Sequence, residues 1–245
     1  MKSIYKYFNI NDFSIDALKK RSVWLSSPTN FNDPYDCGLS IDYERLRKEE
    51  DDYFRLMFRS SDEKDKEKAI RMGLTPGWVI SVAKCNMEEY FGAIGICSFS
   101  ESKLNLLLWA HYADKHKGFC VEYDCSDGSK LKELLERVNY VNDIPSITHR
   151  EINNSGDGEG RKRYFSNLAL IKSTDWQYEK EWRLIQDYQN QYYRDELNIK
   201  AIYLGTRFDS NNKDLLINAL GDTSSKIQIK QIEKKKSSFE LYVKT

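Results

Sequence analysis

Residues 94–124 read IGICSFSESKLNLLLWAHYADKHKGFCVEYD and predict a strand, a helix and a second strand. The apolar run at residues 94–99 favours a strand. Residues 104–117 carry leucines and aromatic side chains at helical spacing, and Gly118 then supplies the left-handed conformation that ends many helices. Residues 119–123 alternate so that their large apolar side chains share one face, as on a strand that borders a core.

Working outward, the rest of the chain predicts further strands, separated by helices and closed by a hairpin. The expected strands lie at residues 4–7, 23–26, 138–141, 181–186, 199–204, 227–232 and 239–243. The expected helices lie at residues 129–137, 161–172 and 213–220, with another that starts at the N-cap residue Ser14 and ends in the cations of residues 19–21. This order predicts an α+β fold: a mixed, mostly antiparallel sheet with packed helices.

Residues 41–95 are expected to form a helical insertion within a single α+β domain that spans residues 1–245. Its helix-prone stretches are residues 43–59, 62–72 and 78–91. The insertion packs on the sheet in this interpretation and serves as a lid or as a surface for a partner protein. Residues 153–160 are rich in Asn, Ser, Gly and Asp, cannot bury apolar surface and are expected to form a mobile loop.

The composition narrows the class of protein. Lys and Arg together number 38, as do Asp and Glu, so the chain lacks the excess positive charge of a general nucleic-acid or membrane-surface binder. No apolar run approaches the roughly 20 residues that cross a bilayer, and the first residues lack the apolar core of a secretion signal. Five cysteines without a C-x-x-C pair are expected to be buried free thiols. We therefore expect a soluble, cytoplasmic protein that makes no contact with a membrane.

The first candidate motif is the loop Phe31-Asn32-Asp33-Pro34. Pro34 biases Asp33 away from helical conformations, and the side chains of Asn32 and Asp33 can bond to nearby backbone and stiffen the turn. The motif is either a structural turn or a stiff loop that presents side chains to a ligand.

The second motif is Trp109-Ala110-His111-Tyr112-Ala113-Asp114-Lys115-His116. On one continuous helix, Trp109, Tyr112 and His116 would share one stripe. His111 and His116 would face different sides, which argues against a shared metal ion, and we expect no metal site. The stripe is either core packing with a hydrogen-bonded histidine or a surface that stacks a planar ring such as nicotinamide or adenine.

The third motif, Trp176-Gln177-Tyr178-Glu179-Lys180-Glu181-Trp182-Arg183-Leu184, carries a carboxylate and a guanidinium on one face of a predicted strand. Trp182 and Leu184 point to the opposite, apolar face. Glu181 and Arg183 form either a structural ion pair on an exposed face or a catalytic acid with its partner at a cleft. The sequence does not decide whether Glu179 or Glu181 faces that cleft.

Two other patterns are interpreted as solvent-exposed surface without a functional role. Glu122-Tyr123-Asp124 alternates like an active-site strand, but a solvated sheet edge explains it. The run Lys234-Lys235-Lys236 is expected at the solvated tip of the terminal hairpin.

Together the motifs resemble those of a widespread bacterial family of uncharacterised proteins. The shared segments are residues 5–7, 24–28 (Trp-Leu-Ser-Ser-Pro), 32–34, 97–100, 107–118 and 178–183 (Tyr-Glu-x-Glu-Trp-Arg). Phe8 departs from the pattern, because many relatives carry arginine there. Residues 41–95 and 126–170 are the variable parts.

The order of elements more distantly resembles the ADP-ribosyltransferase fold. The resemblance implies that Glu181 contacts the ribose of NAD, the substrate, and helps nicotinamide leave, and that Arg183 orients Glu181 or meets a phosphate. A site for NAD and a site for another nucleotide ligand both predict that Trp109, Tyr112, Glu181, Arg183 and Asn32 converge on one concave pocket. The residues expected to bind NAD are Tyr5, Tyr7, Ser26, Ser27, Asn32, Asp33, Trp109, His111, Tyr112 and His116.

Three functions stay open at this point. The first is an NAD-dependent ADP-ribosyltransferase-like enzyme, a toxin or phage-defence effector that modifies nucleic acid or protein. The second is a nucleotide-binding or metal-dependent nucleic-acid-processing protein. The third is a non-catalytic partner or regulatory subunit of a bacterial defence system, which binds through residues 41–95.

Overall fold

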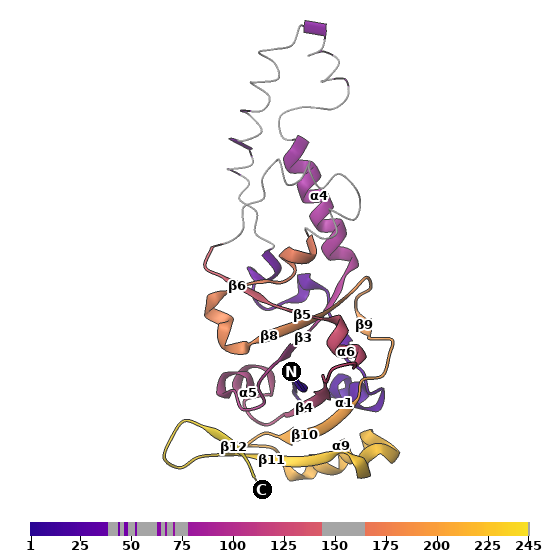
Figure 1. Ribbon diagram of the computed structural model, residues 1–245, viewed down its shortest axis with the longest axis vertical. Coiled ribbons are helices and arrows are strands. Elements are labelled where there is room, and N and C mark those ends of the chain that lie inside the picture. Colours follow the sequence, from indigo (N-terminus) through magenta and orange to yellow (C-terminus); the bar gives the residue numbers. More distant parts are fainter. Residues whose placement is uncertain are drawn as a thin grey trace. The chain divides into compact units, whose positions relative to one another are not determined.

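The computed structural model describes residues 1–38, 78–143 and 165–244, together with residues 44, 47–48, 52, 63–64, 67 and 71 (Figure 1). Two compact units make up the chain. Unit 1 comprises Met1–Ser26, Gly95–Val138 and Asp175–Thr245, and unit 2 comprises Ser27–Ile94 and Asn139–Thr174. The helices predicted at residues 43–59 and 62–72 lie almost entirely outside the described residues, and so does the loop predicted at residues 153–160.

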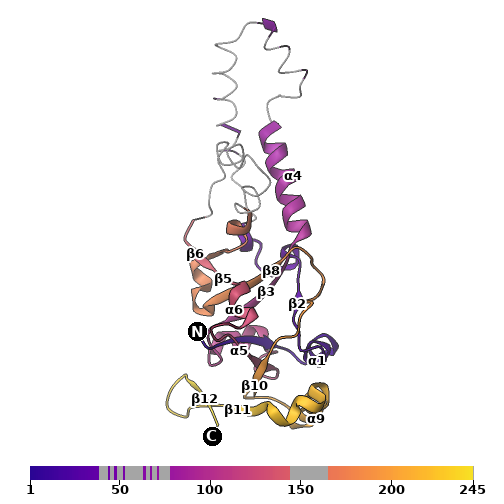
Figure 2. The same ribbon diagram turned by 45° about the vertical axis from the view of Figure 1, so that its right-hand side comes forward.

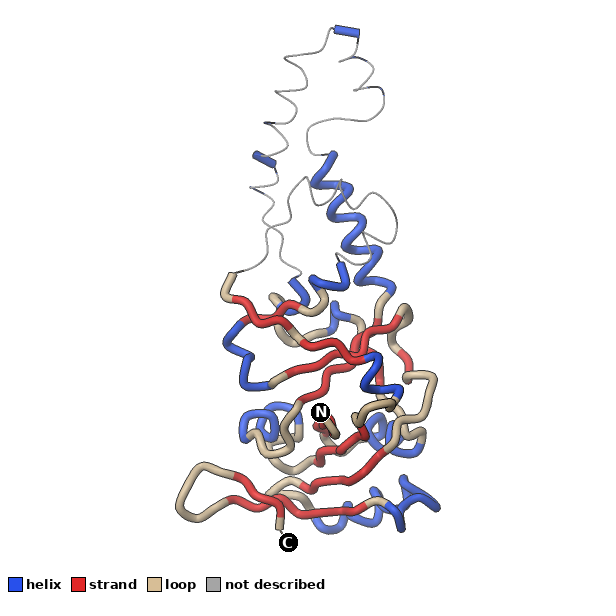
Figure 3. Tube along the Cα trace, viewed as in Figure 1, coloured by secondary structure: helices blue, strands red, loops and turns tan. Residues whose placement is uncertain are grey.

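Unit 1 is built on one eight-stranded sheet, drawn in red in Figure 3. Its strands are β1 (Ser3–Phe8), β3 (Gly95–Ser100), β4 (Phe119–Asp124), β5 (Leu135–Arg137), β8 (Glu181–Gln186), β10 (Ile199–Leu204), β11 (Gln228–Lys234) and β12 (Leu241–Val243). They are ordered β12-β11-β10-β4-β1-β3-β8-β5, and only β10 and β11 run parallel. The prediction of an α+β fold with a mixed, mostly antiparallel sheet is therefore confirmed.

One face of this sheet forms the main apolar core. Ile4, Val121 and Ile202 are fully buried there on three neighbouring strands. The helices α1 (Asp12–Lys19) and α9 (Lys213–Leu220) contact each other and contribute buried side chains to this core, and α6 (Lys130–Leu134) contributes Leu131 (Figure 2). Each such aliphatic side chain gains about 1.5–3 kcal/mol from leaving water, so this face dominates the stability of unit 1.

Local hydrogen bonding moves the start of α1 away from the predicted position. Asn11 is the N-cap, and its side chain accepts a bond from the backbone N–H of Ser14 at 2.8 Å. The Ser14 hydroxyl in turn accepts from the backbone N–H of Asn11 at 3.1 Å. The prediction that Ser14 caps the helix is therefore wrong, because Ser14 holds the third position of a reciprocal capping box.

The helix that covers the opposite face of the sheet is shorter than predicted. It is α5 (Leu106–Tyr112), and Asp114, Lys115 and His116 follow it with positive φ angles of 42°, 54° and 72°. The predicted left-handed Gly118 is also wrong: the three residues before Lys117 make the reversal. Gly118 is required for another reason, because a Cβ atom there would lie 2.0 Å from the carbonyl oxygen of Phe8.

Several smaller elements complete unit 1. A two-stranded sheet pairs β2 (Trp24–Leu25) with β9 (Gln191–Tyr192). Three 3₁₀ helices are η3 (Thr174–Glu179), η4 (Ser210–Asn212) and η5 (Gly221–Lys226), and Thr174 itself falls in unit 2. The helix predicted at residues 129–137 ends early, because the chain after Leu134 joins the sheet as β5.

Unit 2 contains the helix α4 (Trp78–Ala93), the 3₁₀ helices η1 (Pro28–Asn30) and η2 (Asp36–Gly38), and a sheet of β6 (Asn139–Val141) and β7 (Ile171–Ser173). The helix predicted at residues 161–172 is wrong at its end, where the chain forms β7. Lys172 on β7 and Asp36 on η2 are both buried, with their nitrogen and oxygen 3.4 Å apart. This ion pair ties the loop after Pro34 to the small sheet.

Cysteine and membrane predictions can be checked in the described part of the chain. Cys37, Cys97, Cys120 and Cys125 are buried free thiols, whereas Cys85 is exposed on α4. Within the described residues, no helix has the length and apolar character needed to span a bilayer.

Candidate functional site

The register of the sheet aligns polar side chains in a row across one face of unit 1. Tyr5 on β1 lies opposite Glu122 on β4 and opposite Ser100 on β3, and Ser100 lies opposite Glu181 on β8. Residues directly opposite each other in antiparallel strands project from the same face. We call these four residues the polar row. The same face is covered by α5, whose buried Trp109 packs with Tyr5 in a second apolar cluster.

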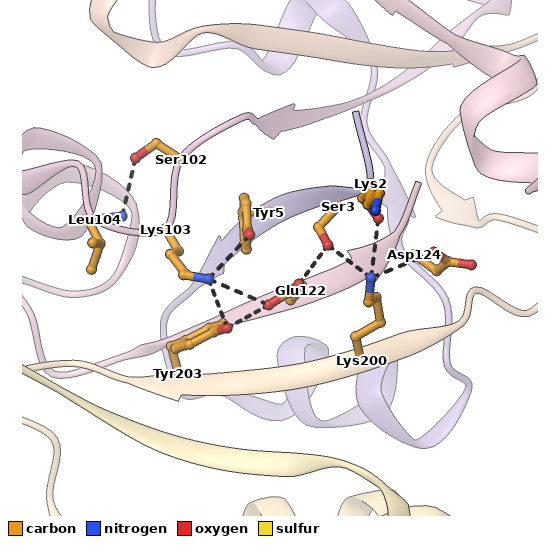
Figure 4. Close-up of polar contacts among 10 residues, drawn as sticks. All are labelled: Lys2, Ser3, Tyr5, Ser102, Lys103, Leu104, Glu122, Asp124, Lys200 and Tyr203. Carbon is orange, nitrogen blue, oxygen red and sulfur yellow. Dashed lines mark hydrogen bonds and ion pairs between the residues drawn. The ribbon is translucent and has the colours of Figure 1, made fainter. Parts of the chain in front are cut away.

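Glu122 is the centre of a hydrogen-bond network at one end of the polar row (Figure 4). Its Oε1 accepts a bond of 2.6 Å from the Ser3 hydroxyl, and its Oε2 accepts a bond of 2.5 Å from the Tyr203 hydroxyl. Its side chain is 12% exposed. The interpretation of this strand as a solvated sheet edge is wrong, because β4 lies in the interior of the sheet between β1 and β10.

Lys103 supplies the positive charge of this network. Its ammonium group lies 3.8 Å from Glu122 Oε2 and donates to the hydroxyls of Tyr203, at 3.1 Å, and Tyr5, at 3.4 Å. The same nitrogen lies 4.8 Å from the ring centroid of Tyr203 and 5.2 Å from that of Tyr5. The side chain is 29% exposed, so the ammonium group is held by two rings and a carboxylate yet remains open to solvent.

Three side chains fix the loop that carries Lys103. The Trp109 indole N–H donates to the Lys103 carbonyl at 2.8 Å, and the Tyr7 hydroxyl donates to the Ser102 carbonyl at 2.7 Å. Asn105 caps α5 and donates to the Tyr178 carbonyl at 2.6 Å. These bonds explain why Trp109 and Tyr7 are buried together, with ring centroids 5.2 Å apart.

The network sets the protonation states of its members. Burial alone would raise the pKa of Glu122, but the bonds from Ser3 and Tyr203 and the charge of Lys103 outweigh burial, so the pKa lies below its ordinary value. Burial, with the charge of Glu122, raises the pKa of Tyr5 to about 12. Burial and the bond to Glu122 also raise the pKa of Tyr203. Both phenols are therefore protonated and Glu122 is ionised at neutral pH.

Glu181 and Arg183 form a much drier pair at the other end of the polar row. Arg183 Nε donates to Glu181 Oε1 at 2.8 Å. The two residues are 2% and 0% exposed. Leu184 and Trp182 point to the opposite, apolar face, as the alternation predicts. The alternative of an ion pair on an exposed face is therefore wrong, and Glu179 is buried as well.

The aromatic motif around α5 is divided between core and surface. Trp109 is fully buried, Tyr112 packs at the edge of the same cluster and His111 is exposed, with its ring 6.4 Å from Trp176. His116 lies beyond the end of α5, so the predicted helical stripe is wrong. Its ring still lies parallel to Trp109 at 6.4 Å, because the left-handed turn folds it back.

The half-buried His116 has an unusual environment. Its Nδ1 is a buried nitrogen without a hydrogen-bond partner in the described part of the chain. Burial, with the charge of Arg207, lowers its pKa, so the imidazole is neutral at physiological pH.

The other residues predicted to bind NAD lie on the segment that follows β2, and they are Ser26, Ser27, Asn32 and Asp33. Ser26 in unit 1 exchanges two backbone hydrogen bonds with Ile96. In unit 2, the Ser27 side chain caps η1, Asn32 is exposed and Asp33 accepts from the backbone N–H of Tyr35 at 2.9 Å. Asp33 thus makes the structural turn that the sequence allows.

The residues that sequence analysis missed are Lys103, Tyr203 and Glu122. Lys103 and Tyr203 lie in no motif, and only their position across β1 and β4 brings them together. Glu122 carried a usable signal, because a carboxylate between buried neighbours on a strand requires partners. In the part of the chain that the structure describes, no cluster of three or more His, Cys, Asp or Glu residues is arranged to hold a metal ion.

Comparison with known proteins adds one match. Residues 108–184 match a family described as Protein of unknown function (DUF2971). The DUF2971 segment runs from α5 to β8 and therefore contains Trp109, Glu122, Glu181 and Arg183. It supports the expectation of an uncharacterised domain family over that segment. No curated protein and no solved structure matches the chain.

Proposed function

We propose that unit 1 binds NAD on the face of the polar row and transfers ADP-ribose to an acceptor, in an ADP-ribosyltransferase-like fold. The observation that carries the proposal is the Glu181 carboxylate, held at 2.8 Å by Arg183 and aligned in register with the hydroxyl groups of Ser100 and Tyr5. A strand-borne acid with neighbouring hydroxyls has the chemistry that recognition of a ribose requires.

The proposed reaction breaks the bond between the ribose C1′ atom and the nicotinamide nitrogen. The bonding electrons leave with nicotinamide, and positive charge develops on the ribose before the acceptor nucleophile forms the new bond to C1′. Glu181 stabilises this charge, and Arg183 keeps the carboxylate ionised and fixed. Preorganised electrostatic stabilisation of this kind contributes several kcal/mol in enzymes, and more where water is excluded.

Other groups of the protein cover Glu181 before NAD binds. Because the residue is 2% exposed in the free protein, NAD has to displace the groups that cover it, a rearrangement of the kind that many enzymes undergo on binding. The acceptor in this proposal is a nucleic acid or a protein, and the biological role is that of a toxin or phage-defence effector.

The same burial favours a second candidate, a non-catalytic protein in which the pair serves the fold. Arg183 is among the largest fully buried side chains, and buried ion pairs occur as structural elements. In this candidate the chain is a binding or regulatory partner. The residues proposed for binding that partner are 41–95. Of these, residues 78–93 form α4, whereas most of residues 41–77 lie outside the described part of the chain.

The test measures NAD consumption and label transfer with labelled NAD, with and without nucleic acid or cell lysate. Glu181→Gln keeps the size of the side chain and removes its charge, so turnover should fall by at least about 100-fold. Glu133→Gln is the matched control and should retain full turnover, because Glu133 is exposed on α6, which packs on the opposite face of the sheet.

A double variant separates catalysis from folding. Glu181→Leu with Arg183→Met removes both charges, and such replacement of a buried pair is often neutral for stability. Under the transferase proposal the double variant folds but does not consume NAD. If the wild-type protein consumes no NAD under any of these conditions, the non-catalytic candidate stands instead. If the double variant consumes NAD as fast as wild type, Glu181 is not the catalytic acid and the transferase proposal fails.

A further inference from the structure

The hairpin formed by β11 and β12 presents an aromatic side chain to solvent at its tip. Phe239, in the loop between the strands, is 97% exposed. Single exposed apolar residues are common on protein surfaces. A phenylalanine with almost its whole ring in water, however, makes almost none of the hydrophobic contribution to stability that its burial would give. We infer that this tip, residues 234–240, binds single-stranded nucleic acid, with Phe239 stacked on a base and the adjacent lysines on phosphates.

Charge around the tip suits an anionic partner. The whole chain is neutral, yet the tip at residues 234–240 contains three lysines and one glutamate. Lys235 pairs with Glu240, and Lys244 pairs with Glu233. Lys234 and Lys236 are exposed and have no ion-pair partner within the described residues. Two ammonium groups beside the exposed ring are therefore available for phosphates.

The stem of the hairpin is anchored, which holds the tip in place. Ile232 on β11 and Leu241 on β12 are buried in the cluster that contains Trp109 and Tyr203. A backbone bond of 2.9 Å from the Lys235 N–H to the Glu240 carbonyl closes the loop. Figure 1 shows this loop, in yellow, projecting beyond the strands of the sheet. A fixed stem lowers the ordering entropy that a ligand has to overcome.

The chemistry of the tip favours nucleic acid over a lipid surface. Between Lys236 and Glu240, Phe239 is the only apolar side chain, and Ser237 and Ser238 are the others. Membrane-inserting segments bury a larger apolar face, whereas a base needs only one ring and a nearby cation. A single strand is favoured over a duplex because only an unpaired, unstacked base offers a free face to the ring. This inference is independent of NAD chemistry.

The experiment measures fluorescence anisotropy of a labelled single-stranded oligomer of mixed sequence, about 12 nucleotides long, with the full chain, over a range of salt concentrations. Phe239→Ala should weaken binding about tenfold, which corresponds to about 1.4 kcal/mol. Lys234→Ser with Lys236→Ser should lower the slope of log affinity against log salt by about 1.4, because each phosphate that a lysine neutralises on a single strand adds about 0.7 to that slope. Because these side chains are exposed, the melting temperature should not change.

Two controls are matched in chemistry and exposure. Phe13→Ala removes an exposed phenylalanine from α1, and Lys117→Ser with Lys213→Ser removes two exposed lysines elsewhere in unit 1. Both should leave affinity and salt slope unchanged. The inference fails if the chain does not bind the oligomer, if the control variants weaken binding as much as the tip variants, or if the tip binds anionic vesicles in preference to the oligomer.

Discussion

Glu181 and Glu122 lie at the two ends of the polar row, and the negative charges of these two buried carboxylates are stabilised in different ways. Glu181 is 2% exposed and is neutralised by a fully buried guanidinium on its own strand. Glu122 is more open, and its charge is shared by two hydroxyl donors and an ammonium group from three other segments of the chain. One is a local, dry pair and the other a distributed network that reaches solvent.

This difference indicates which end tolerates change. A dry ion pair depends on both members, since removing one leaves the other charge in a low dielectric. A network with several donors and access to water keeps part of its stabilisation when one member is removed. The Glu181 end should therefore lose stability sharply when one of its two charges is removed alone, and the Glu122 end should be adjustable by substitution and by pH.

The largest expected effect comes from Arg183→Met. Removing the guanidinium while Glu181 remains should lower the free energy of unfolding by about 3–5 kcal/mol, as measured by urea unfolding. Arg137→Met on β5, an exposed arginine in the same sheet, should change it by less than about 0.5 kcal/mol. A decrease below about 1 kcal/mol for Arg183→Met would mean that water reaches the pair, and the contrast with Glu122 would disappear.

An intermediate effect is expected for Glu122→Gln, of about 1–3 kcal/mol at pH 7. Because the folded-state pKa of Glu122 is lowered, the ionised carboxylate stabilises the fold fully above the unfolded value of about 4.3 and this contribution disappears as pH falls through the folded pKa. Urea unfolding of wild type and variant between about pH 7 and pH 3 should show the difference shrinking only below about pH 4. A difference that does not depend on pH would refute a charge-based role for Glu122.

The smallest effects distinguish the two tyrosines that contact Lys103. Tyr203→Phe removes a hydroxyl that bonds to Glu122 and to Lys103 and should lower the free energy of unfolding by about 1 kcal/mol, because Glu122 keeps Ser3 and Lys103 as partners. Tyr5→Phe removes only a 3.4 Å bond from Lys103 and keeps the ring, so a decrease of about 0.5 kcal/mol is expected. Thermal or urea unfolding measures both, and equal decreases would show that the ring contacts, not the hydroxyls, hold Lys103.

Several features of the fold could be predicted from local pattern. The alternation on β4 and β8 correctly placed Tyr123 and Leu184 in the core, and the order of strands and helices correctly predicted an α+β class. The end of α5 could not be predicted, because Asp114, Lys115 and His116 are compatible with a helix. Their left-handed conformation brings the chain back so that Gly118 fits against Phe8.

The candidate site was predicted only in part, because some of its residues are close in the sequence and others meet only through strand pairing. Glu181 and Arg183 are two residues apart, so strand geometry alone puts them on one face. Lys103, Glu122 and Tyr203 are far apart in the sequence, and their meeting depends on the register between β1, β4 and β10.

By itself, the amino-acid sequence determined the class of the fold, the faces of individual strands and the neutral overall charge, because these depend on residue type and on spacings of a few residues. Tertiary structure alone decided which strands became neighbours and what covered each face. The sequence pattern alone favoured a surface position for Glu122, but the pairing of the strands makes it the centre of a hydrogen-bond network. The same packing shields Glu181 from water. Side-chain periodicity specifies a direction from the backbone, whereas burial depends on what the rest of the chain brings to that side.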